Sequence, residues 1–229
     1  MFVNPVLALP LYRTSIGKKM VMAVTGFVGV GYALLHMYGN LKVFAGREQF
    51  NAYAEFIRSV GEPLVPHMGV LWMIRLVVLV CVVLHIVSAV LLTRQDRAAR
   101  PVAYAYRATV QASYAARTMR WGGTILLLFL CYHILHMTLG TIHPQFAPGD
   151  VYHNVIVGFQ SWPATLVYVG AMLAFGLHLY HGAWSMLQTL GLTNATTNRM
   201  LRGAALLLAL VVTGGYCIVP LAVVLGFVQ

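Results

Sequence analysis

The stretch GVLWMIRLVVLVCVVLHIVSAVLLT, residues 69–93, decides the fold of this chain. Its apolar run exceeds the roughly 20 helical residues that cross the hydrocarbon core of a bilayer. Its only charged residue, Arg75, lies close to one end, and its only histidine is His85. A segment with this length and composition predicts a transmembrane helix.

Four further apolar stretches repeat this pattern. They cover about residues 19–41, 121–141, 162–190 and 201–228. The composition agrees, because 60% hydrophobic and 9% charged residues lie outside the range of soluble domains. We therefore predict an all-α membrane protein, in which residues 1–229 form one transmembrane domain built from five helices.

The basic residues orient this bundle. Eleven of them fall on the side of the N-terminus, and only Lys42, Arg47, Arg58 and Arg75 fall on the other side. The positive-inside rule then predicts a cytoplasmic N-terminus. Topology also explains the net charge of +10 better than nucleic-acid binding does. The eleven are Arg13, Lys18, Lys19, Arg94, Arg97, Arg100, Arg107, Arg117, Arg120, Arg199 and Arg202.

Histidines carry the chemical signal of the sequence. An ionisable ring inside a bilayer is costly to leave unpaired, so it is a candidate for a functional site. Of the nine histidines, His67, His143 and His153 fall in outer loops or at helix ends, where we expect them to be solvated. The six within predicted spans are His36, His85, His133, His136, His178 and His181.

The depths of these rings arrange them in pairs. At the helical rise, His36 and His136 each lie about 6 Å from the outer ends of their spans, and His85 and His178 each lie about 24 Å below the outer surface. Two level pairs suit two stacked haems, each taking one imidazole from either side. Hydrogen bonding between helices, or a haem-free transporter with a histidine proton relay, is the alternative.

Several motifs combine these histidines with a particular context. Together they resemble the cytochrome b membrane-anchor subunit of succinate dehydrogenase and fumarate reductase, in its single-chain, five-helix, dihaem form. The resemblance covers nearly the whole chain. The motifs are RTSIGKK (13–19), TG (25–26), His36, FNAYA (50–54), His85, RTMRW (117–121), HILHMT (133–138), HLYHG (178–182) and QTLG (188–191).

The resemblance implies a function for the whole chain. It would be the membrane anchor of a succinate:quinone oxidoreductase (complex II) in the cytoplasmic, or inner, membrane. It would pass electrons between an iron-sulfur partner and quinone, with menaquinone expected rather than ubiquinone. A flavoprotein subunit and an iron-sulfur subunit would dock on the cytoplasmic face. A dihaem cytochrome serving another quinone-linked oxidoreductase stays open as an alternative.

The resemblance also implies which histidines bind the two haems b. The outer haem iron would take His36 and His136, and the inner one His85 and His178. His133 and His181 would be alternative ligands or groups that donate to propionates and orient neighbours. His133 and His136 share a helix face at three-residue spacing, and depth favours His136.

A quinone site needs a group that exchanges protons, and no predicted span contains a carboxylate. Three of the five carboxylates, Glu48, Glu55 and Glu62, belong to the polar segment 44–67. We expect this segment to form a short amphipathic helix at the outer interface. The resemblance favours Glu55 as the proton-exchanging group, and a solvated loop carboxylate is the alternative reading.

Overall fold

The computed structural model of this chain describes residues 10–99 and 114–229. These ranges are helical, with no strand. Two of the predicted cytoplasmic cations, Arg100 and Arg107, lie outside them. The elements in order are α1 (Pro10–Arg13), α2 (Ser15–Leu41), η2 (Lys42–Ala45), α3 (Arg47–Ser59), α4 (Gly69–Ala98), α5 (Tyr114–His133), η3 (Ile134–Thr138), α6 (Val151–Gln160), α7 (Trp162–Thr189) and α8 (Asn198–Val224).

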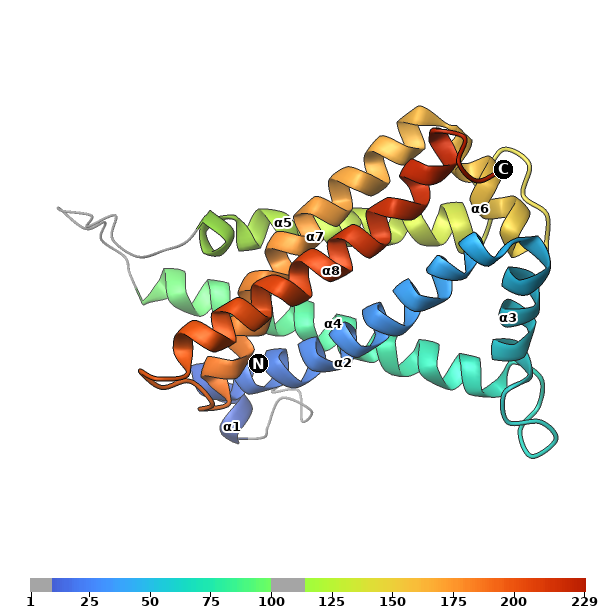
Figure 1. Ribbon diagram of the computed structural model, residues 1–229. Coiled ribbons are helices and arrows are strands. Elements are labelled where there is room, and N and C mark those ends of the chain that lie inside the picture. Colours follow the sequence, from blue (N-terminus) through green and yellow to red (C-terminus); the bar gives the residue numbers. More distant parts are fainter. Residues whose placement is uncertain (1–9, 100–113) are drawn as a thin grey trace.

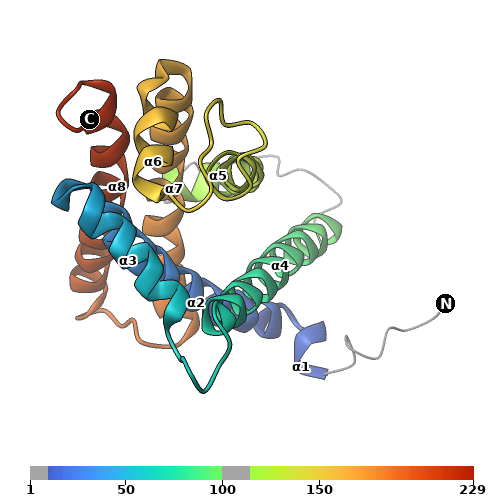
Figure 2. The same ribbon diagram turned by 90° about the vertical axis from the view of Figure 1, so that its right-hand side faces the viewer.

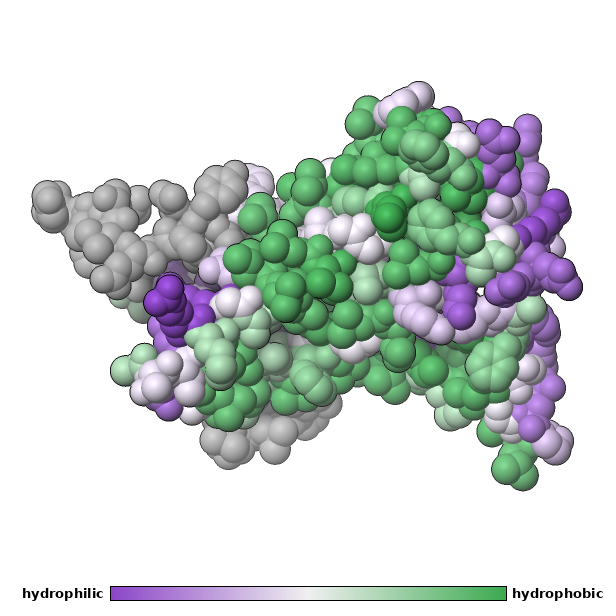
Figure 3. Space-filling model, viewed as in Figure 1, coloured by the Kyte–Doolittle hydropathy of each residue, from purple (hydrophilic) through white to green (hydrophobic). Residues whose placement is uncertain are grey.

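Five of these helices are long and apolar enough to cross a membrane: α2, α4, α5 continued by η3, α7 and α8 (Figure 1). The predicted number of spans is therefore confirmed. Apolar residues dominate the middle of the molecular surface, and polar residues gather at its two ends (Figure 3). This is the surface that a bilayer-spanning bundle presents to lipid. The cytoplasmic position of the N-terminus stays a prediction.

Four of the long helices, α4, α2, α7 and α5, are arranged as a ring that is open between α4 and α5 (Figure 2). Helix α2 packs on α4, α7 and α8, while α7 also packs on α5 and α8. Seen from the end, α4, α2, α7 and α5 occupy the corners of a quadrilateral (Figure 2). In the described residues, neither α2 with α5 nor α4 with α7 is a closely packed pair. These two pairs therefore form the diagonals of the ring.

One end of the bundle is basic, and we call it the basic end. It contains the start of α2, the end of α4, the start of α5 and the turn between α7 and α8 (Figure 1). Thr14 caps α2 by accepting a hydrogen bond from the Gly17 amide at 3.0 Å. The buried Lys18 ammonium donates to the Arg13 carbonyl at 2.9 Å and to Gln95 Oε1 at 3.2 Å. It thereby joins the beginning of α2 to the end of α4.

The opposite end carries a cap of short helices, η2, α3 and α6, beside the C-terminus (Figure 1). Helix α3 is the short helix expected in segment 44–67. Its Phe50 is buried in an apolar cluster with Val43 of η2, Phe159 of α6 and Val219 of α8. Apolar burial therefore holds this cap end on the long helices.

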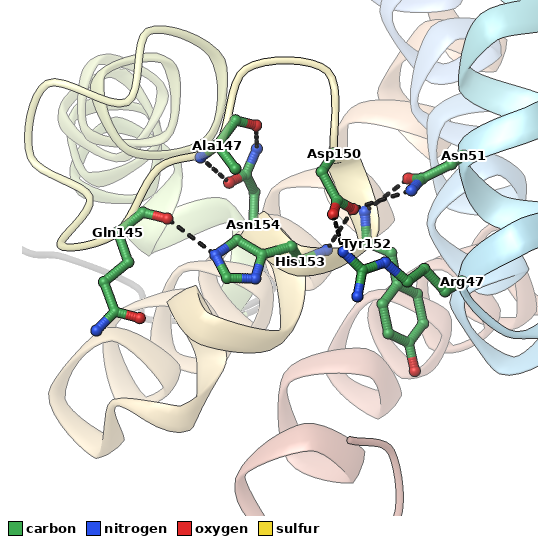
Figure 4. Close-up of polar contacts among 8 residues, drawn as sticks. All are labelled: Arg47, Asn51, Gln145, Ala147, Asp150, Tyr152, His153 and Asn154. Atoms are coloured by element: carbon green, nitrogen blue, oxygen red, sulfur yellow. Dashed lines mark hydrogen bonds and ion pairs between the residues drawn. The ribbon is translucent and has the colours of Figure 1, made fainter.

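A polar clasp joins α3 to α6 (Figure 4). Asp150 is the N-cap of α6 and accepts from the His153 amide at 3.0 Å. The same carboxylate accepts from Asn51 Nδ2 at 2.9 Å and forms an ion pair with Arg47. In return, Asn51 Oδ1 accepts from the Tyr152 amide at 3.0 Å. One carboxylate thus organises the contact between two cap helices.

These contacts change the acidity of Asp150. The hydrogen bond from Asn51, followed by those from the His153 amide and Arg47, lowers the pKa of Asp150 below its ordinary value of 3.8, against the opposing effect of burial. A carboxyl group with a lowered folded-state pKa stabilises the fold above its unfolded pKa. That stability is lost as the pH falls through the folded pKa.

We predict that Asp150→Ala destabilises the cap end by about 1 kcal/mol, as expected for loss of an N-cap side chain. Thermal unfolding of the purified protein in detergent, followed by cysteine accessibility or circular dichroism, measures the effect. Asp96→Ala, which removes an exposed carboxylate at the other end of the molecule, is the control. Lowering the pH below about 4 should reduce the difference in stability between wild type and the Asp150 variant. A stability difference that does not change with pH would contradict the stabilising role of the Asp150 carboxylate.

Candidate functional site: two pairs of histidines across the bundle

The inner pair is His85 on α4 and His178 on α7. Their ring centroids lie 6.2 Å apart, and both side chains are half-buried. Glycines adjoin both rings: a Cβ on Gly26 would lie 3.5 Å from His85 Cε1, and one on Gly123 would lie 3.8 Å from His178 Cε1. The sequence predicted His85 and His178 at the same depth, and the structure places the two imidazoles side by side across the diagonal between α4 and α7 (Figure 2).

The outer pair is His36 on α2 and His133 at the end of α5. Their ring centroids lie 5.9 Å apart, and both side chains are half-buried. Tyr32 stacks on His36 with a centroid distance of 5.5 Å, and Tyr216 of α8 lies 6.1 Å from it. This pair spans the second diagonal, between α2 and α5.

His136 lies elsewhere, although its predicted depth matches that of His36. Its side chain is only 2% exposed and stacks on Tyr132 and His143, at 5.3 and 5.0 Å between centroids. His136 lies in η3, a π-helix whose bond from the Leu139 amide to the Ile134 carbonyl spans five residues. In this wider turn the regular α-helical spacing does not apply, so helical rise alone does not fix the position of the His136 ring.

A tyrosine from α7 links the two histidines of this segment. Tyr168 Oη lies 3.2 Å from His133 Nδ1 and 3.1 Å from His136 Nδ1. A phenol has one proton to donate, so it donates to one imidazole and accepts from the other. Tyr168 was not among the predicted site residues. A polar hydroxyl inside an apolar predicted span was the available signal.

His143 corrects an expectation from the sequence. We expected a solvated loop histidine, but its side chain is only 7% exposed. Its Nε2 lies 2.8 Å from the Asn154 carbonyl, and its ring stacks on His136. The loop between η3 and α6 folds over the end of the bundle because Asn154 bonds both the amide and the carbonyl of Ala147, at 2.8 and 2.9 Å (Figure 4).

Two other predicted site residues lie apart from these pairs. His181 contacts Trp184, with ring centroids 6.3 Å apart, and its Nδ1 is buried without a hydrogen-bond partner in the described part of the chain. Glu55 is exposed on α3, where it pairs with Arg58 at 3.3 Å and lies 3.8 Å from His67. Glu48 and Glu62 are exposed as well.

The spacing of the two diagonal pairs matches what one metal between two imidazoles requires. With metal–nitrogen bonds of about 2 Å, rings on opposite faces of one iron have centres about 6 Å apart. Both observed separations, 5.9 and 6.2 Å, meet this condition. Residues 10–99 and 114–229 contain no group of three or more His, Cys, Asp or Glu side chains suited to an isolated ion.

Comparison of the chain with protein families, curated proteins and solved structures found no match. The resemblance described above therefore rests on the motifs alone. The geometry of the histidines is an independent observation, because it follows from the packing of four helices.

We predict that Tyr168→Phe lowers the free energy of unfolding by about 1–3 kcal/mol, because it leaves a buried imidazole nitrogen without its partner. Tyr132→Phe is the matched control. Tyr132 also stacks against His136, but the described residues give its hydroxyl no hydrogen bond. Thermal unfolding of both variants in the same detergent makes the measurement. Equal stability of the two variants would contradict the role assigned to the Tyr168 hydroxyl.

Proposed function

We propose that this chain is a dihaem membrane-anchor cytochrome b subunit of a succinate:quinone oxidoreductase. The observation that carries the proposal is the pair of diagonals, His36 with His133 and His85 with His178, at the spacing of two imidazoles on one iron. Each haem b, when bound, would supply reversible one-electron chemistry between its ferric and ferrous states.

The residues of the chain hold the two sites. Neutral imidazoles from α2 and α5 would bind one iron, and those from α4 and α7 the other. The absence of close packing along both diagonals in the described helices is consistent with a group held between them.

The outer ligand set differs from the one that the sequence favoured. We assign His133, the alternative that the sequence left open, in place of His136, because His133 is the ring beside His36. His136 is packed among Tyr132, His143 and Tyr168. It would orient His133 through the Tyr168 hydroxyl rather than bind metal.

The two ends of the bundle suit different partners. The basic end carries Arg13, Lys19, Arg94, Arg97 and Arg202, and it would receive the iron-sulfur and flavoprotein subunits. The cap end carries all three glutamates and would adjoin the quinone site. Glu55 would exchange protons with quinone there, provided that its pairs with Arg58 and His67 open.

A haem-free histidine relay is the alternative function. One observation favours it: Tyr168, His133, His136 and His143 form a continuous chain of contacts. These contacts belong to the cap end, and within the described residues no hydrogen bond or ring contact continues them to His85 and His178. A relay would need a path through the whole bilayer, so this arrangement favours the haem proposal.

We predict two haems b per chain in the purified protein. His85→Ala or His178→Ala should remove one haem, and His36→Ala or His133→Ala the other, because each iron loses one of its two ligands. A pyridine haemochrome count, together with reduced-minus-oxidised spectra, measures both. His136→Ala and His181→Ala are the controls and should keep two haems. If His136→Ala loses a haem and His133→Ala keeps both, the outer ligands are His36 and His136, as depth had favoured. Zero haem in the wild type would refute the proposal.

We predict that Glu55→Gln suppresses quinone-linked succinate oxidation at least tenfold while both haems remain, because an amide cannot exchange a proton at this position. Glu48→Gln, on the same helix, is the control. The assay uses the complex captured through a tag on this chain, and succinate oxidation by soluble dyes should continue at the wild-type rate. Capture of a flavoprotein that does not oxidise succinate would favour the anchor of another oxidoreductase. Equal quinone turnover in both variants would exclude Glu55.

A further inference from the structure

The inner histidine His85 has a hydrogen-bond partner that the sequence did not reveal. Thr25 of α2 is buried, with 7% of its surface exposed. Its Oγ1 lies 3.1 Å from His85 Nδ1 and 2.7 Å from the Val21 carbonyl one turn earlier in α2. The Met22 carbonyl lies 3.3 Å from the same hydroxyl. Three groups therefore converge on one hydroxyl oxygen.

Counting protons assigns the roles of these groups. Backbone carbonyls only accept, so the single hydroxyl proton of Thr25 is committed to Val21, its nearest acceptor, or shared with Met22. The oxygen is then left to accept from the imidazole. His85 must carry its proton on Nδ1, and the lone pair of a neutral ring is therefore on Nε2.

The other three paired rings lack this arrangement. His178 Nδ1 is buried without a hydrogen-bond partner in the described residues. His133 Nδ1 faces the Tyr168 hydroxyl, which also faces His136 and can donate to either ring. No hydrogen bond to the His36 ring is found in the described residues. Among the four paired rings, and within the described residues, His85 alone faces a hydroxyl whose proton a backbone carbonyl already accepts.

We propose that Thr25 is a positioning residue, which holds His85 in the tautomer that presents Nε2 to a metal and makes this ring the more basic ligand of the inner pair. The inference rests on the proposed function, since it concerns the haem between His85 and His178. A hydrogen bond accepted from a ligand's other ring nitrogen raises the basicity of that ligand. A more basic ligand stabilises the ferric state, so the contact with Thr25 lowers the midpoint potential of the inner haem.

Substitutions at Thr25 test this role in the intact complex. Thr25→Val keeps the size of the side chain and removes the hydroxyl, whereas Thr25→Ser keeps the hydroxyl. We expect Thr25→Val to shift the midpoint potential of one haem in the positive direction and to weaken haem retention about tenfold, in the range seen for loss of such partners. Thr25→Ser should keep wild-type values for both. The measurements are a spectroscopic redox titration and the haem count after dilution in detergent.

A second buried threonine provides the matched control. Thr165 is fully buried on α7 and donates to the Phe159 carbonyl at 2.9 Å, but the described residues place no imidazole on its hydroxyl. Thr165→Val therefore removes a comparable hydrogen bond and should leave both midpoint potentials unchanged. A potential that is unchanged in Thr25→Val, or equally shifted in Thr25→Ser, would overturn the proposal.

Nitrogen-15 NMR of the haem-free chain separates this inference from the proposed function. In protein labelled on histidine nitrogens, with His85→Gln used for assignment, the wild type should show His85 protonated on Nδ1, and Thr25→Val should lose this preference. If the chain binds no haem and His85 still shows the expected tautomer, the haem proposal is refuted while the role of Thr25 in fixing the ring stands. The opposite tautomer in the wild type would refute the role of Thr25 whatever the haem content.

Discussion

The need to pair polar rings in a medium without water governs the interior of this bundle. An imidazole inside the hydrocarbon layer has no solvent to satisfy it, so it must find a partner from another helix or a metal. Four helices bring their rings toward each other along two diagonals, His36 with His133 and His85 with His178. Three sides of the same quadrilateral are closely packed pairs: α2 with α4, α2 with α7, and α5 with α7. The helices that pack and the helices that present facing histidines are therefore different pairs.

The surroundings of the two diagonals are unequal. Near the cap end, the ring of His133 belongs to a cluster of polar and aromatic groups. Tyr168 joins it to His136, and His136 stacks on Tyr132 and His143. Toward the basic end, His85 faces one hydroxyl, that of Thr25. If the proposed haems are bound, two sites with the same ligand type but different neighbours would differ in electron affinity, because basicity and local dielectric both act on a metal. Under the proposed function, this inequality would give electron transfer a direction between the two ends of the bundle.

The short helices of the cap end are positioned by a small number of polar and apolar contacts. Asp150 joins the beginning of α6 to α3, and Phe50 anchors α3 in an apolar cluster with α6 and α8. His143 closes the loop before α6 by bonding the Asn154 carbonyl and stacking on His136. The cap is thereby connected to the same π-helical segment that follows His133.

The amino-acid sequence by itself determined the five spans, because hydropathy and length are local properties that can be compared directly with the thickness of a bilayer. It also predicted the inner pair, since regular helical rise carries His85 and His178 to the same depth. The outer pair depended on the tertiary structure. His136 lies in the π-turn after His133, where regular helical spacing does not apply, and its ring is buried in a packed cluster although depth had favoured it as the partner of His36. The hydrogen bond between His85 and Thr25 joins segments 60 residues apart, and the burial of His143 depends on how its loop folds back on Asn154 and His136; no local pattern encodes either contact.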